Sequence, residues 1–400
     1  MLIDLDVAPP PSRPRPRRDW GRGLKPVLLA ALLLLVGGAA SPARTAVIVQ
    51  VADTRGVSVI AHLLTPDVLY VARPRVYGSV IEAIPLAAGE PGWTVNVPAS
   101  LPMLSRDVSG KVLVVEPRDE GQGTFLDART GRELWRAPQY SNIRVLGDRV
   151  AVWTYRDDWG RGLLRMAEVT SGRTLWQRPA EPMTMDGVAG RWLVTVDDYG
   201  RGSVYETAGG KVLADGRDVQ IDPDDLGLYD THRSATEAVV GDTLYWWTPA
   251  FVSAYRLPAL KKLWRVEVAD PSAVVACGSL ACALGPAGIT AVDPASGKTR
   301  WHGTGWKTLT GDVATTGIGR AARLDLATGK VVEELGRGAP AGDLLLRFER
   351  DRSWATGLAD RRVIGVLPLV FPTSCDRVGP YLACPTAGQT VTVWRIGPSS

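Results

Sequence analysis

"TFLDARTGRELWRAP", residues 124–138, is one copy of a pattern that recurs along this chain. Altered copies are RMAEVTSGRTLWQRP at 165–179 and ITAVDPASGKTRWHG at 289–303. In each copy an acidic residue stands eight places before a tryptophan, and a glycine stands four places before it. Self-similarity at a fixed period predicts that one supersecondary unit is used many times.

The tryptophans set the period of the repeat. Neighbouring copies place them 42, 41 and 37 residues apart. Two further copies keep the acid and the glycine but carry Ala214 or Glu333 at the tryptophan place. The repeat tryptophans are Trp93, Trp135, Trp176, Trp264 and Trp301.

The residues between the copies are typical of β-strands. GDRVAVWTYRDDWGRG (147–162) and GDTLYWWTPAFVSAYRL (241–257) both consist of a strand-like run, a polar or glycine turn, and a second run. No long apolar period of 3.6 residues occurs after residue 45, so we predict an all-β domain over residues 45–396. Four antiparallel strands repeated about every 40 residues are typical of a β-propeller blade. We expect the tryptophans to be structural and to fill the gap between adjacent sheets.

The repeat also resembles a known family. The pattern D-x-x-[ST]-G-x-x-x-W at Asp127 to Trp135 and at Asp293 to Trp301 is similar to the pyrroloquinoline-quinone (PQQ) repeat. Degenerate copies run from Glu168 to Trp176 and from Asp325 to Glu333, and the resemblance covers most of residues 55–396. Such repeats occur in quinone-dependent alcohol dehydrogenases and in non-catalytic scaffolds. The chain resembles the scaffold type, that of the propeller lipoprotein of the outer-membrane barrel-assembly machine.

The number of blades follows from counting the repeat units. Seven to nine blades are compatible with the sequence, and we predict eight. The last segment, 373–396, needs a partner strand, which TAVIVQV at 45–51 would supply by pairing the two ends of the domain. The candidate units lie near 57–97, 100–139, 141–180, 182–217, 235–268, 271–303, 304–336, 340–369 and 373–396.

The first 43 residues predict export. Residues 1–25 are rich in Pro and Arg, and an apolar run without charge follows over residues 26–43. We predict a cytoplasmic tail and one hydrophobic helix that serves as a signal anchor or transmembrane helix. The propeller would then be extracytoplasmic on a single-pass protein of the cell membrane. The alternative is secretion after signal cleavage.

The four cysteines agree with export. Cys277 and Cys282 bracket one short turn, and Cys375 and Cys384 bracket another. Opposed positions of a hairpin can lie within disulfide reach, so we predict the bridges 277–282 and 375–384. The alternative is a four-cysteine metal site, but the spacing within each pair is wider than that of zinc sites.

No motif for catalysis is present. The resemblance to quinone dehydrogenases implies a pair of adjacent cysteines, which this sequence lacks. Asp222, Asp224, Asp225 and Asp230 lack the register of a calcium loop. GIGRAA (317–322) lacks the βαβ context of a dinucleotide site, and His62, His232 and His302 are scattered. We therefore predict no catalytic residues, no cofactor and no metal.

The distribution of charge along the chain indicates what kind of partner the domain can bind. Six basic and three acidic residues precede Val27, so the rest of the chain accounts for +1 of the formal net charge of +4. This near-neutral remainder disfavours nucleic acid as a partner. We expect a monomeric, membrane-anchored scaffold that binds an unknown envelope protein or peptide. The alternative is a quinone-dependent dehydrogenase or a small-ligand sensor that uses the central channel.

Overall fold

The computed structural model describes most of the chain beyond residue 46. The described residues are 47–54, 58–118, 122–155, 162–180, 182–188, 190–197, 201–215, 236–317, 319–349, 351–386 and 388–397. The predicted tail (1–25) and the predicted hydrophobic helix (26–43) lie outside them. No helix within the described residues is long and apolar enough to span a membrane.

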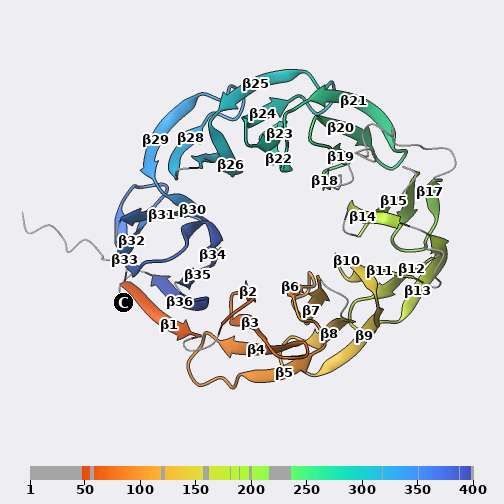
Figure 1. Cartoon of the computed structure of the whole chain (residues 1–400), viewed down its shortest axis with the longest axis horizontal. Helices are drawn as coiled ribbons and strands as arrows, with labels where there is room; N and C mark the ends of the chain where they lie inside the picture. Colours follow the sequence, from red (N-terminus) through yellow and green to blue (C-terminus); the bar gives the residue numbers. More distant parts are fainter. Residues whose placement is uncertain are drawn as a thin grey trace, which may run out of the picture. The chain divides into compact units, whose positions relative to one another are not determined.

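Residues Ala46–Gly397 form one compact unit of nine four-stranded antiparallel sheets arranged in a ring (Figure 1). In each of the first eight sheets, which we call blades, four strands consecutive in the chain follow one another from the centre to the rim. The first strand of each blade faces the centre of the ring, and the last forms the outer edge. The all-β propeller is therefore confirmed.

The strands of blades 1 to 4 have the following bounds. Blade 1 consists of β2 (Ala61–Leu64), β3 (Val68–Pro74), β4 (Ser79–Pro85) and β5 (Trp93–Val97). Blade 2 consists of β6 (Pro102–Arg106), β7 (Val112–Pro117), β8 (Gln122–Asp127) and β9 (Glu133–Gln139). Blade 3 consists of β10 (Ser141–Leu146), β11 (Arg149–Tyr155), β12 (Gly162–Glu168) and β13 (Thr174–Ala180). Blade 4 consists of β14 (Pro182–Val188), β15 (Trp192–Asp197), β16 (Gly202–Glu206) and β17 (Val212–Ala214).

Blades 5 to 8 follow the same order. Blade 5 consists of β18 (Thr236–Val240), β19 (Thr243–Trp247), β20 (Phe251–Arg256) and β21 (Lys261–Glu267). Blade 6 consists of β22 (Ala273–Cys277), β23 (Leu280–Gly285), β24 (Gly288–Val292) and β25 (Thr299–Thr304). Blade 7 consists of β26 (Trp306–Thr310), β27 (Val313–Thr316), β28 (Arg320–Leu324) and β29 (Val331–Arg337). Blade 8 consists of β30 (Ala339–Ala341), β31 (Leu344–Glu349), β32 (Arg352–Gly357) and β33 (Val363–Pro368).

Blade 9 joins the two ends of the domain. A short 3-10 helix, η2 (Pro372–Ser374), precedes β34 (Asp376–Val378), β35 (Tyr381–Thr386) and β36 (Thr390–Gly397). The fourth strand is β1 (Val47–Asp53), which pairs antiparallel with β36 from Val47↔Gly397 to Asp53↔Thr392. The predicted pairing of the ends is confirmed. The prediction of eight blades is wrong, because β1 makes the last segment a complete ninth blade.

The core lies between the blades. Nine clusters of buried apolar side chains occupy the nine interfaces between neighbours, one cluster to each. In β7, for example, four successive residues from Val112 to Val115 are buried, because this strand is covered on both faces. Eight of the clusters hold seven to eleven buried residues, whereas the cluster between blades 7 and 8 holds four. That interface is therefore the least apolar of the ring.

The acid and the glycine of the repeat form the turn between the third and fourth strands. In blade 2, Oδ1 of Asp127 accepts hydrogen bonds from the backbone N–H groups of Arg129 and Thr130, at 3.1 and 2.9 Å. Gly131 has a φ of 71°, a left-handed conformation that glycine adopts without a Cβ penalty. The sequence pattern therefore encodes a tight corner that returns the chain to the outer edge.

Both predicted disulfides are present. Cys277 and Cys282 join β22 to β23, and Cys375 and Cys384 join the segment after η2 to β35. The described residues contain no free cysteine. The second bridge lies in blade 9, the blade that closes the ring.

Candidate functional site

The five repeat tryptophans lie at blade interfaces. Each indole Nε1–H donates a hydrogen bond to a backbone carbonyl in the corner of the next blade. Trp135, for example, donates to the carbonyl of Val169 at 2.9 Å, and its ring stacks on Phe125 with a centroid distance of 3.7 Å. The acceptors of Trp93, Trp135, Trp176, Trp264 and Trp301 are Ala128, Val169, Thr207, Pro294 and Leu326.

The repeat glycine of the next blade lies against each of these rings. A Cβ atom added at Gly172 would lie 2.6 Å from Cδ2 of Trp135, and one added at Gly297 would lie 2.6 Å from Cγ of Trp264. The same relation holds at the other three tryptophans. Tryptophan and glycine therefore form a matched pair across each of these interfaces, and the indoles connect blades instead of lining a common cavity.

Where the tryptophan is missing, the glycine is missing too. Blade 4 has Ala214 at the tryptophan place, and blade 5 has Leu260 at the glycine place, with both in one buried cluster. Blade 7 has Glu333 at the tryptophan place, and blade 8 has Arg361 at the glycine place. Nη1 of Arg361 lies 2.6 Å from Oε1 of Glu333. Leu260 and Arg361 keep the left-handed φ of the corner, at 51° and 60°. The compensating residues Leu260 and Arg361 were not predicted, because the acid of the repeat is also replaced in these two corners, by Arg256 and Gly357.

A group of charged residues lies on the first strands of blades 3, 4 and 5 and on the second strand of blade 2. Arg144 on β10 forms an ion pair of 2.5 Å with Asp186 on β14. Asp186 is buried and also accepts hydrogen bonds from the backbone N–H groups of Gly187, at 2.7 Å, and Val239, at 3.2 Å. Asp186 therefore links blades 3, 4 and 5. No motif in the sequence indicated this arrangement.

Two glutamates near this ion pair titrate close to neutral pH. Burial raises the pKa of Glu237 on β18 to about 7, and Asp186 adds to the rise, while Arg144 opposes it. Burial likewise raises the pKa of Glu116 on β7 to about 7, against the opposing charges of Arg144 and Arg118. Two arginines, Arg144 and Arg118, therefore face three carboxylates, and protonation relieves part of the imbalance.

These raised pKa values predict a pH-dependent stability. Because the folded-state pKa of Glu237 lies above its unfolded value, its favourable contribution is complete below about pH 4.5 and is lost as the pH rises through about 7. We expect Glu237→Gln to raise the free energy of unfolding at pH 8 by about 1–2 kcal/mol, a figure reduced for partial exposure. Urea unfolding at pH 5 and pH 8 measures this, with the exposed Glu90→Gln as control. If Glu237→Gln changed the free energy of unfolding equally at pH 5 and pH 8, the raised pKa of Glu237 would be contradicted.

The histidines lie apart. His62 on β2 approaches Asp376 on β34 at 3.2 Å, which connects blade 1 to blade 9. His302 on β25 shares a hydrogen bond of 3.0 Å with Thr290. His232 lies outside the described residues, as do Asp222, Asp224, Asp225 and Asp230. Among the residues that the structure describes, no three His, Cys, Asp or Glu side chains are placed to hold a metal ion.

The two faces of the ring differ in their exposed apolar residues. One face carries the loops between the second and third strands of each blade and the segments that connect successive blades. We call it the b–c face. All exposed aromatic, leucine, isoleucine and methionine side chains of the described residues lie there. They are Ile60, Tyr77, Leu101, Met103, Tyr140, Phe348, Leu369 and Phe371, together with Val76.

The opposite face and the rim expose only valines among the large apolar residues described. These are Val49, Val108, Val212, Val331, Val332, Val363 and Val366. On the b–c face, by contrast, Tyr77 is 93% exposed, and Leu101 and Phe371 are each 56% exposed. Leu101 and Met103 also line a cavity of about 410 Å³ between the inner strands of blades 1 and 2. The b–c face is therefore the more apolar surface.

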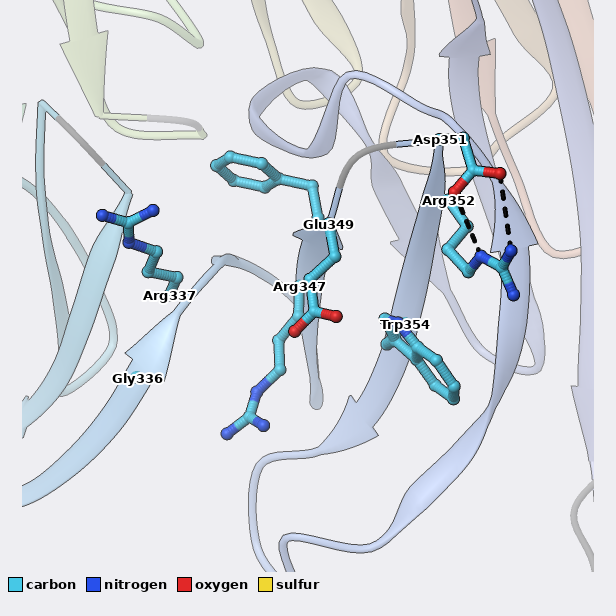
Figure 2. A pocket seen from close by; sticks show the side chains of 8 residues that line it. Gly336, Arg337, Arg347, Glu349, Asp351, Arg352 and Trp354 are labelled. Atoms are coloured by element: carbon cyan, nitrogen blue, oxygen red, sulfur yellow. Dashed lines mark hydrogen bonds and ion pairs between the residues drawn. The ribbon is translucent and has the colours of Figure 1, made fainter.

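A second cavity opens between blades 7 and 8 (Figure 2). Its volume is about 930 Å³. It lies at the interface with the smallest apolar cluster, where the tryptophan and glycine of the repeat are replaced. Its lining consists of Gly336, Arg337, Arg347, Phe348, Glu349, Asp351, Arg352 and Trp354.

Comparison with known proteins supports the repeat. Residues 52–183 match a family model described as outer membrane protein assembly factor BamB. The domain is a β-propeller, and its similarity to this family covers residues 52–183. The propeller is similar to BamB from Moraxella catarrhalis, with 18% identity, a TM-score of 0.50, and coverage of 87% of this chain and 98% of that one. It is also similar to the C-terminal WD40 domain of Sif2, with 9% identity, a TM-score of 0.48, and coverage of 88% and 98%. No curated protein sequence matches the chain.

Proposed function

We propose that this protein is a non-catalytic scaffold of the cell envelope. An extracytoplasmic propeller, tethered to the membrane by the apolar segment 26–43, would bind another envelope protein or a peptide through its b–c face. The observation that carries the proposal is the gathering of exposed aromatic and long aliphatic side chains on that face. Protein interfaces are enriched in aromatic residues and methionine, and exposed apolar patches commonly mark them.

The family match supports a role in assembly. The matching family model is described as an assembly factor, not as an enzyme. The similarity to BamB of Moraxella catarrhalis shows the fold alone, because the identity is 18%. The two disulfides support an extracytoplasmic location, since such bonds persist in oxidising compartments.

Photo-crosslinking in cells tests the binding face. A photoreactive amino acid at Tyr77, Tyr140 or Phe371 is expected to give one reproducible crosslinked species, identified by mass spectrometry. Matched positions on the opposite face and rim, Val108 and Val331, are expected to give none. Crosslinks from both sets, or only from the valines, would contradict the choice of face. A failure of every position to crosslink would contradict the scaffold function.

A further inference from the structure

The interface between blades 7 and 8 departs from the pattern of the ring. Only four buried apolar residues occupy it, and an ion pair replaces the tryptophan and glycine. Arg361 pairs with Glu333 at 2.6 Å, and Arg323 pairs with Asp312 at 2.8 Å and with Glu333 at 3.3 Å. Departures from local consistency in natural proteins concentrate at functional sites. This interface is therefore a candidate ligand site.

The cavity holds one arginine whose guanidinium has no acceptor among the described residues. Arg337 makes no ion pair or side-chain hydrogen bond with any other residue in the described part of the chain. Nη2 of Arg347 donates to the carbonyl of Leu335 at 2.8 Å, but its Nε is buried and has no partner there. Arg352 differs, since its guanidinium is paired with Asp351 at 3.2 Å (Figure 2). Arg337 therefore offers donors for an incoming acceptor, whereas the free Nε of Arg347 is enclosed by protein.

The cavity also offers apolar walls. The ring of Phe348 is 39% exposed and extends toward Gly319 of blade 7, where an added Cβ would lie 2.9 Å from it. Trp354 on β32 lies opposite Arg347 in the strand register and lines the same space. Aromatic surface beside an unpaired arginine suits a ligand that has both an apolar and an anionic group.

The charge of the lining selects among anions. Among the described residues, three arginines and two acidic residues line the cavity, which is a surplus of one positive charge. A monoanionic carboxylate matches this surplus, and guanidinium groups bind carboxylates with directed, charge-assisted hydrogen bonds. Glu349 faces the same cavity and opposes anions of higher charge, such as phosphate. A volume of about 930 Å³ is in the range that holds a ligand the size of a short peptide.

We infer that the cavity between blades 7 and 8 binds an extended peptide segment of a partner protein, in which a carboxylate stands next to an aromatic or aliphatic side chain. The carboxylate pairs with Arg337, and the apolar side chain lies against Phe348. The inference rests on the proposed function, because it specifies what part of a partner the propeller recognises.

Panning a phage-displayed library of random heptapeptides on the whole extracytoplasmic chain tests the inference. Enriched peptides are expected to carry Asp or Glu beside an aromatic or aliphatic residue. The affinity of a synthetic copy is expected to fall roughly tenfold in Arg337→Ala, as for the loss of a charge-assisted hydrogen bond. Arg75→Ala removes an exposed arginine from the same face outside the cavity and is expected to leave the affinity unchanged. Arg337→Lys is expected to recover part of the loss.

The outcomes separate the inference from the proposed function. Enriched peptides without an acid, or binding that is insensitive to Arg337→Ala, would overturn the inference while the scaffold function stands. The same holds if no peptide is enriched but crosslinks from Tyr77, Tyr140 or Phe371 capture a partner. Inhibition by inorganic phosphate as strong as that by the peptide carboxylate would overturn the proposed charge selectivity. No enrichment together with no crosslink would overturn both.

Discussion

Replacing Trp135 with alanine is expected to lower the free energy of unfolding by about 3 kcal/mol. The substitution removes a ring that stacks on Phe125 and lies against Gly172 of the next blade. It also removes the hydrogen bond from the indole to the carbonyl of Val169. Because Trp135 is only partly buried, the expected loss is at the lower end for removal of a large aromatic side chain. Equilibrium unfolding in urea measures it.

Trp135→Phe is the matched control. Phenylalanine keeps a ring between blades 2 and 3 but cannot donate to the carbonyl of Val169. We expect it to cost about 1 kcal/mol for the hydrogen bond and part of the packing term. Equal destabilisation by alanine and phenylalanine would mean that the hydrogen bond carries the whole effect. A loss below about 0.5 kcal/mol in alanine, the range of ordinary surface substitutions, would contradict a structural role for the indole.

Gly329→Ala is expected to lower the free energy of unfolding by about 3 kcal/mol, from two separate causes. Gly329 has a φ of 69°, which costs any residue with a Cβ atom roughly 1–2 kcal/mol. The new Cβ would also lie 2.5 Å from Cδ2 and Cε3 of Trp301, so the indole must move. Overpacking of this kind adds roughly 1–3 kcal/mol.

Gly311 in the same blade separates the two causes. Its φ is 60°, but an added Cβ would meet no atom within 4 Å. Gly311→Ala should therefore show the conformational cost alone, about 1 kcal/mol. Adding Trp301→Ala to Gly329→Ala should give a total loss smaller than the sum of the single losses, since removing the ring relieves the clash. Equal effects of the two glycine substitutions would show that the contact with Trp301 is unimportant.

Much of the fold was predictable because its determinants are local. The corner needs an acid that accepts from backbone N–H groups two and three residues on, and a glycine at a left-handed φ, all within five residues such as Asp127 to Gly131. Each cysteine pair brackets one turn, so its pairing was also visible. The blade count was off by one because the last blade is shared by β1 and β34–β36, from opposite ends of the domain.

The candidate sites were not predictable, and the reason is distance along the chain. Glu116, Arg144, Asp186 and Glu237 belong to four blades, and none stands in a motif. The cavity lining extends from Gly336 in blade 7 to Trp354 in blade 8. The cavity exists because few apolar side chains occupy that interface, which becomes visible only when the two blades are packed together.

The chain therefore specifies its repeating unit through short-range turn chemistry and a two-residue strand period, which operate on each segment separately. The polarity of each blade interface depends on residues about 40 positions apart in the chain, and these residues meet only once the ring has closed. The same is true of the face that exposes aromatic side chains. Packing between blades depends on the side chains of two neighbouring repeats, so it cannot be predicted from one repeat alone. Trp135 with Gly172 and Glu333 with Arg361 are two solutions at the same place in the repeat, and the second of them coincides with a cavity.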